Sequence, residues 1–187
     1  MTYETNEIAG LTADFINTTD QNVFLTGKAG TGKTTFLKYI IENTHKKTVV
    51  AAPTGIAAIN ATGVTLHSLL QLPFGAFIPE RITPPNVNAQ FTTLYNLFAG
   101  LRFNKSKRQL IQEMELLIID EVSMLRADLL DSIDHMLRHL RKRKDEVFGG
   151  VQILFIGDLL QLPPVVKDQE WQILKDYYES SYFFEAK

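Results

Sequence analysis

The sequence Gly27-Lys28-Ala29-Gly30-Thr31-Gly32-Lys33-Thr34 follows the apolar run Val23-Phe24-Leu25 and precedes 35–41, where apolar residues recur at helical spacing. A short buried strand that runs through a glycine-rich turn into an amphipathic helix is the context in which G-x-x-x-x-G-K-[ST] is informative. Glycines let backbone N–H groups turn inward, a helix N-terminus carries partial positive charge, and a lysine can reach terminal phosphates. The stretch therefore predicts a loop that binds the phosphates of a nucleotide.

The predicted nucleotide contacts are the residues of this loop and the one that follows it: Gly27, Ala29, Gly30, Thr31, Gly32, Lys33, Thr34 and Thr35. We expect Lys33 to neutralise the β- and γ-phosphates and the Thr34 hydroxyl to bind Mg²⁺. The alternative is a glycine-rich turn with a solvated lysine, and the strand and helix on its two sides argue against it.

A second apolar run, residues 116–119, ends in Asp120 and Glu121. Its four consecutive aliphatic residues are typical of a parallel strand buried on both faces, and ligand sites of such sheets lie beyond the carboxyl ends of the strands. We expect Asp120 to hold Mg²⁺ through its hydration shell and Glu121 to accept a proton from the water that attacks the γ-phosphate. The alternative is a strand end with two solvated acids.

A third apolar run, residues 151–156, is followed by Gly157-Asp158 and then by Gln161. Phosphoryl transfer depends on positioning and electrostatics, so a polar group from a neighbouring strand is expected to sense the γ-phosphate. Gln161 is the candidate for this third catalytic role. Asp158 is the rival, although it could equally cap the turn.

The remaining pattern predicts one α/β domain. A strand over 48–52 ends at Pro53, and residues 73–90 contain four of the seven prolines and indicate an exposed insertion. Helices are expected over 5–18, 56–61, 104–113, 125–140 and 169–178, and residues 182–184 are strand-like. Four strands alternating with helices predict a parallel sheet flanked by helices, in a single domain that spans residues 1–187 and begins with a helix within 1–20.

The composition sets outer bounds on function. With 19 Lys+Arg, 21 Asp+Glu and a net charge of −2, the chain has no global basic field, so nucleic-acid contacts must be local. It has no cysteine, which excludes disulfides and thiolate metal sites. No apolar run reaches membrane-spanning length and the N-terminus lacks a secretion signal pattern, so we expect a cytoplasmic, nucleoid-associated protein without a membrane partner.

Four segments together resemble the first RecA-like domain of superfamily 1B DNA helicases: 27–35, 52–58, 118–124 and 157–165. The closest resemblance is to the Pif-type (petite integration frequency) group, with RecD-type helicases next. Residues 63–68 look like that group's Gly-x-Thr-x-His-Ser segment, and 128–150 look like its signature element. Residues 20–72 and 110–187 match well, whereas 1–19 and the insertion 73–109 match loosely.

The resemblance implies an ATP-dependent helicase that moves 5′-to-3′ along single-stranded DNA and acts on duplex or structured DNA in repair, recombination or replication. It implies that Gln161 links nucleotide state to the DNA path, and that this path is lined by Pro53, Thr54, Gly55 and His67. It also implies a second RecA-like domain after residue 187, which supplies an arginine to the ATP site. We therefore expect this chain alone to bind Mg²⁺-nucleotide but to hydrolyse it poorly. Such helicases usually carry an adenine-reading glutamine upstream of the P-loop strand, and no glutamine occurs among residues 1–20.

Two other functions fit parts of the pattern. One is a P-loop kinase or transferase for a small molecule, with 73–109 as its lid; the other is a nucleotide-gated binding module without turnover. Individual residues also have plainer interpretations. His67 could be a satisfied histidine at a helix start, and the basic run 138–144 could bind DNA phosphates or be a solvated helix end. Arg126 and Lys28 are expected to be solvated.

Overall fold

A five-stranded parallel sheet forms the centre of the computed structural model, which describes residues 7–80, 91–99 and 101–187. The strand order is β1-β7-β6-β2-β3, and every neighbouring pair is parallel. The strands are β1 (Val23–Thr26), β2 (Thr48–Ala52), β3 (Val64–Thr65), β6 (Leu116–Ile119) and β7 (Gln152–Gly157). Four of them lie where the sequence predicts strands. The two-residue strand β3, which pairs with the end of β2, was not predicted.

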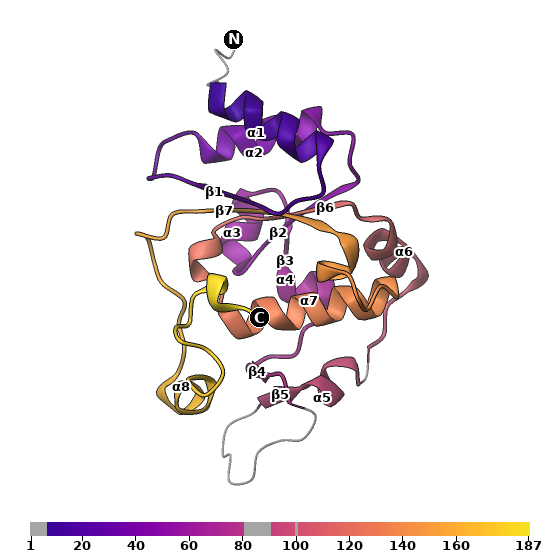
Figure 1. Ribbon diagram of the computed structural model, residues 1–187, viewed down its shortest axis with the longest axis vertical. Helices are drawn as coiled ribbons and strands as arrows, with labels where there is room; N and C mark the ends of the chain where they lie inside the picture. Colours follow the sequence, from indigo (N-terminus) through magenta and orange to yellow (C-terminus); the bar gives the residue numbers. More distant parts are fainter. Residues whose placement is uncertain (1–6, 81–90, 100) are drawn as a thin grey trace.

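Helices cover both faces of this sheet (Figure 1). On one face lie α1 (Glu7–Thr18) and α2 (Lys33–Asn43); on the other lie α4 (Leu66–Leu70) and α7 (Ala127–Arg141). The short α3 (Gly55–Asn60) follows β2, and α6 (Lys105–Glu113) leads into β6. The predicted α/β fold with a parallel sheet flanked by helices is therefore confirmed.

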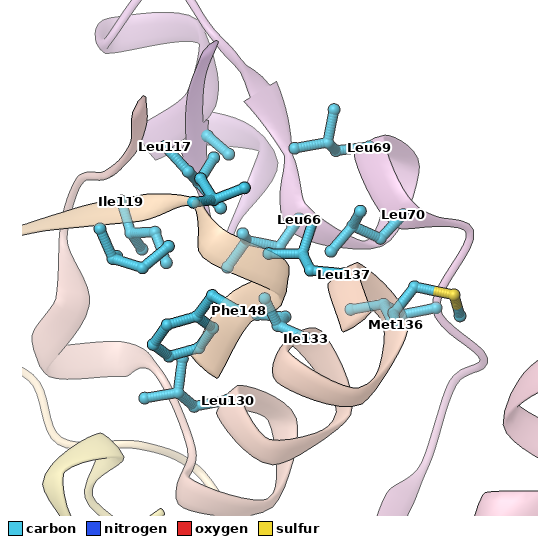
Figure 2. Packing of buried hydrophobic residues seen from close by; sticks show 14 of the residues in the cluster. Leu66, Leu69, Leu70, Leu117, Ile119, Leu130, Ile133, Met136, Leu137 and Phe148 are labelled. Atoms are coloured by element: carbon cyan, nitrogen blue, oxygen red, sulfur yellow. The ribbon is translucent and has the colours of Figure 1, made fainter. Parts of the chain in front are cut away.

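The central strand β6 shows why the molecule has two layers of core. Successive side chains of a strand point to opposite faces. Leu116 and Ile118 pack with the α1 and α2 side chains, while Leu117 and Ile119 pack with those of α4 and α7. Figure 2 shows the second cluster, in which Leu117 and Ile119 face Ile133 and Leu137 of α7. All four β6 side chains are fully buried, as the uninterrupted aliphatic run predicts.

A second, two-stranded parallel sheet begins within residues 73–90, the segment that was predicted to be an exposed insertion. Its strands are β4 (Ala76–Ile78) and β5 (Phe91–Thr93), and every residue of both is buried. Helix α5 (Leu94–Phe98) follows β5. The expectation of an exposed segment is thus wrong for 76–78, because these residues pack under α7 and α8 (Asp168–Leu174). Residues 81–90 of the predicted insertion lie outside the described residues.

The last segment also differs from expectation. Residues 182–184 are not a strand: Tyr182 makes an isolated antiparallel bridge with Arg126, and a 3₁₀ helix η3 (Phe183–Glu185) follows. The Phe183 ring lies between Phe155 of β7, at 5.2 Å between centroids, and Phe24 of β1, at 5.4 Å. Packing of this aromatic side chain against two strands has replaced the expected strand pairing. Two further 3₁₀ turns are η1 (Val122–Met124) and η2 (Val147–Gly150).

No helix in the described ranges is long and apolar enough to cross a membrane.

Candidate functional site: the carboxyl edge of the sheet

The glycine-rich loop connects the end of β1 to the start of α2. Gly30 and Gly32 have φ angles of 80° and 92°, in the left-handed region that glycine adopts without strain. Gly32 is the N-cap of α2 and no side chain caps this helix end, so its first N–H groups face the loop. A Cβ on Gly27 would lie 2.7 Å from the Thr31 hydroxyl, which explains why the loop also begins with glycine.

Lys33 bends back over this loop. Its ammonium donates hydrogen bonds to the carbonyl oxygens of Gly27 at 2.5 Å and Lys28 at 3.0 Å. The Thr31 hydroxyl donates to the same Lys28 carbonyl at 2.8 Å. Thr34 and Thr35 are exposed in the first turn of α2, beside Lys33. The loop thus gathers a positive charge, free helix N–H groups and two hydroxyls in one place.

The acidic pair lies at the end of β6, in the middle of the sheet. The Asp120 N–H donates to Ala51 on β2 at 3.0 Å, and the Asp120 carboxylate accepts the Glu121 N–H at 3.0 Å. Glu121 has a φ of 53°, a left-handed conformation that non-glycine residues rarely adopt. Such strain is held in place by its surroundings and is concentrated at functional sites.

Electrostatics connect this acidic pair to the lysine. Burial raises the pKa of Asp120, while the Glu121 N–H and the Lys33 charge act in the opposite direction. Burial and the Asp120 charge raise the pKa of Glu121; Lys33 opposes this and Asp158 adds to it. Lys33 follows β1 through the glycine-rich loop, and the acidic pair and Asp158 follow β6 and β7. Because these three strands are parallel neighbours, all of these groups lie at the same edge of the sheet.

The end of β7 supplies Asp158 and Gln161. Asp158 is 7% exposed, and its carboxylate accepts the Leu160 N–H at 3.1 Å, so it caps the turn, as its alternative interpretation predicted. The Asp158 carbonyl accepts the Gln161 N–H at 2.9 Å, and the Gln161 side chain is exposed. The role of Gln161 as a sensor stays a prediction. A Cβ on Gly157 would lie 2.8 Å from Val122 Cγ1, so β7 approaches the turn after Glu121 closely.

The four residues predicted to contact DNA follow β2 and β3, the two strands on the far side of β6. Thr54 caps α3 by accepting the Ala57 N–H at 3.2 Å, with Pro53 before it and Gly55 opening the helix. His67 lies in the first turn of α4, and its ring stacks on Phe74 with 5.4 Å between centroids and 13° between planes. Since Ala52 and Thr65 are paired neighbours on β2 and β3, these loops emerge side by side.

Arg126 is not solvated, contrary to expectation. Its guanidinium donates to both carboxylate oxygens of Asp128, at 2.8 and 2.7 Å, and to Glu170 at 2.9 Å. Asp128, only 3% exposed, also accepts the Phe77 N–H at 2.9 Å. This network joins the start of α7 to β4 and α8. Asp128 lies two positions from Arg126, so this ion pair could have been predicted from the sequence. Glu170 is remote in the sequence, and its contact with Arg126 could not.

The basic run 138–144 is not a uniformly solvated helix end, and its binding of DNA phosphates stays a prediction. Arg138 pairs with Asp134 at 2.6 Å, and Arg141 donates to the carbonyls of Gly149 at 2.7 Å and Met114 at 2.6 Å. The three residues that follow Arg141 are exposed. Arg138 therefore pairs within α7, and Arg141 joins the end of α7 to the Gly149 and Met114 backbone.

Comparisons with known proteins agree with this geometry. The family model of PIF1-like helicases matches residues 3–186. The chain belongs to the PIF1-like helicase family. It is 35% identical over 164 residues to the ATP-dependent DNA helicase RRM3 of Saccharomyces cerevisiae, covering 85% of this chain and 20% of that protein. It is 40% identical over 150 residues to the ATP-dependent DNA helicase Pif1 of Psychrobacter, covering 79% of this chain and 20% of that protein.

A solved structure of a Pif1 helicase from Bacteroides, in complex with ADP-AlF3 and single-stranded DNA, superimposes with a TM-score of 0.83 at 50% identity. The match covers 97% of this chain and 38% of that chain. The chain therefore has the RecA-like fold of this family's domains, and it spans about a fifth of the length of these two curated relatives.

Proposed function

We propose that this protein is an ATP-dependent DNA helicase that moves 5′-to-3′ on single-stranded DNA, and that residues 1–187 are its first RecA-like, ATP-binding domain. One observation carries the proposal: the glycine-rich loop with Lys33 follows β1, and the acidic pair Asp120–Glu121 follows β6, at the carboxyl edge of one parallel sheet. The Bacteroides relative, whose complex contains ADP-AlF3 and single-stranded DNA, supports it.

The loop residues fit a nucleotide triphosphate. The free N–H groups at the start of α2 offer hydrogen bonds to phosphate oxygens, and Lys33 can exchange its two carbonyl partners for them. A charge-assisted hydrogen bond to phosphate is stronger than one to a neutral carbonyl, so this exchange is favourable.

The oxygen donors Thr34 and Asp120 fit Mg²⁺, which in nucleotide sites takes one or two protein groups besides phosphates and water. In the described parts of the chain, no three His, Cys, Asp or Glu side chains gather as a metal site. When bound, Mg²⁺ would neutralise charge on the β- and γ-phosphates. Glu121, with its raised pKa, is then the general base that orients water and takes its proton.

The DNA path is proposed to run over the loops that follow β2 and β3, where Pro53, Thr54, Gly55 and His67 emerge together. Gln161, exposed after β7, is proposed to report nucleotide state to this path. The proposed partners are single-stranded and forked or duplex DNA, together with a second RecA-like domain, and the proposed location is the nucleoid-associated cytoplasm. The match covers 38% of the Bacteroides chain, which supports the proposal of a second RecA-like domain as a partner.

The test is ATP hydrolysis by the full-length protein with and without oligo-dT, combined with unwinding of duplexes that carry either a 5′ or a 3′ single-stranded tail. We expect DNA-stimulated hydrolysis and unwinding of the 5′-tailed duplex only, both lost in Lys33→Ala. Transfer of the γ-phosphate to a small metabolite with no response to DNA would instead identify a kinase. ATP binding that persists without any turnover would identify a nucleotide-gated binding module.

A further inference from the structure

An exposed aromatic ring stands beside the proposed DNA path. Phe74 is 79% exposed, although large apolar side chains such as phenylalanine are usually buried. One face of its ring is covered by the nearly parallel imidazole of His67. Burial and the positive charge of Arg126 lower the pKa of His67, which favours a neutral imidazole in this stack. The other face of the Phe74 ring is left toward solvent.

The backbone around this pair is fixed rather than loose. Gln71, with a φ of 52°, ends α4, and its side-chain amide exchanges two hydrogen bonds of 3.0 Å with the backbone of Arg102. Gly75, with a φ of 107°, turns the chain directly after Phe74 and into β4. Phe74 is therefore presented from a short segment that is held at both ends.

Basic side chains lie on the same part of the surface. The Lys107 ammonium donates a hydrogen bond to the carbonyl oxygen of Ser68, the residue after His67, and lies 5.7 Å from the ring centre of Phe103. Arg102, bound through its backbone to Gln71, is exposed. An exposed planar ring, with basic residues on the segments bonded to α4, suits a ligand that has flat apolar faces and negative charges, which are the features of a single-stranded nucleic acid.

We propose that the His67–Phe74 stack is a platform on which one base of single-stranded DNA stacks through the open face of Phe74, with Lys107 and Arg102 beside it for the backbone phosphates. This inference rests on the proposed function and adds Phe74, a residue that the sequence motifs did not single out. His67 acts as the support of the platform. Because every base has a π face, the contact tolerates any sequence.

The test compares three variants of the full-length protein with the unchanged protein for binding to fluorescent oligo-dT and to an oligonucleotide of equal length made of abasic sites. Phe74→Ala should weaken oligo-dT binding about ten-fold, the loss expected of one base–aromatic stack, and should leave binding to the abasic strand unchanged. Phe74→Trp should retain or strengthen oligo-dT binding, and its fluorescence should be quenched by DNA. Lys107→Gln should weaken binding to both strands and flatten the dependence of affinity on salt.

Phe15→Ala is the matched control, because Phe15 is 44% exposed on α1, on the other side of the sheet. It should bind both strands like the unchanged protein. Equal affinity of Phe74→Ala and the unchanged protein for oligo-dT would overturn the platform and leave the helicase proposal standing. Equal losses on the oligo-dT and abasic strands would also overturn it, since stacking requires a base. If the unchanged protein binds neither strand, the proposed function itself fails.

Discussion

The Lys33 ammonium lies 2.5 Å from the carbonyl oxygen of Gly27, so the lysine of the glycine-rich loop is bound to the loop's own first residue. A buried or half-buried cation needs a partner, and here backbone carbonyls serve that purpose. These partners are neutral, which leaves the positive charge available to an incoming phosphate. The contact thus keeps the loop folded around its cation before any nucleotide arrives.

Lys33→Ala should weaken ATP binding about 10- to 100-fold, the effect expected when a charged hydrogen-bond donor is lost. Titration of the protein with a fluorescent ATP analogue measures this directly. Lys28→Ala is the control, because Lys28 is an exposed lysine of the same loop whose backbone carbonyl, rather than its side chain, contacts Lys33. A similar loss in both variants would show that the loop needs positive charge in general and not the Lys33 ammonium.

The rate of hydrolysis should fall on the acid side of neutrality at a higher pH than an ordinary glutamate would give. Burial and the Asp120 charge raise the pKa of Glu121, and a general base works only when deprotonated. Asp158→Asn removes one negative charge that acts on Glu121, so it should lower this pKa and move the acid limb of the profile to lower pH. Asparagine retains an oxygen acceptor for the Leu160 N–H, which preserves the turn.

The measurement is kcat against pH with saturating ATP and DNA, with circular dichroism confirming the fold at each pH. Lys33 also acts on the pKa of Glu121 and lowers it. It is left unchanged in this experiment, because its removal is expected to weaken nucleotide binding. An acid limb that stays in place or moves to higher pH in Asp158→Asn would contradict the role of Glu121 as the base.

The strands that carry the site were predictable because local sequence decides them. An uninterrupted aliphatic run such as 116–119 is typical of a strand that is buried on both faces. The strands β2 and β6 match their predicted bounds. The glycine-rich loop was predictable for a similar reason, since its backbone needs left-handed conformations at Gly30 and Gly32. Chain order then places the loop and the acidic pair at the same edge of a parallel sheet.

The missed features depend on partners far away in the sequence. β4 and β5 have three residues each and stabilise one another only after the chain between them has closed. The burial of Arg126 depends on Glu170, 44 positions later. Local patterns contain no information about such contacts.

Asp128→Asn should lower the free energy of unfolding by about 3 kcal/mol or more, because it removes a carboxylate from a largely buried ion pair and leaves the Arg126 charge with Glu170 alone. Urea denaturation at neutral pH measures this. Glu146→Gln is the control: it breaks the exposed pair with Arg143, which should cost at most about 1 kcal/mol. Equal small losses in both variants would mean that the Arg126 network contributes no more than a surface ion pair.

Gly149→Ala should lower the free energy of unfolding by about 1 to 3 kcal/mol, the usual cost of a left-handed non-glycine residue held in place. Gly149 has a φ of 60°, and a Cβ there would lie 2.8 Å from the carbonyl oxygen of Leu137, a backbone atom of α7 that cannot move aside. The Phe148 N–H, which donates to Asp134, would be displaced with it. Gly10→Ala provides a control of opposite sign, because Gly10 lies inside α1 with open space around its Cβ position, and alanine there should stabilise the helix by about 0.5 to 1 kcal/mol. Chemical denaturation of both variants measures the free energy of unfolding. If Gly149→Ala is as stable as the unchanged protein, the close approach of η2 to α7 does not stabilise the segment 128–150.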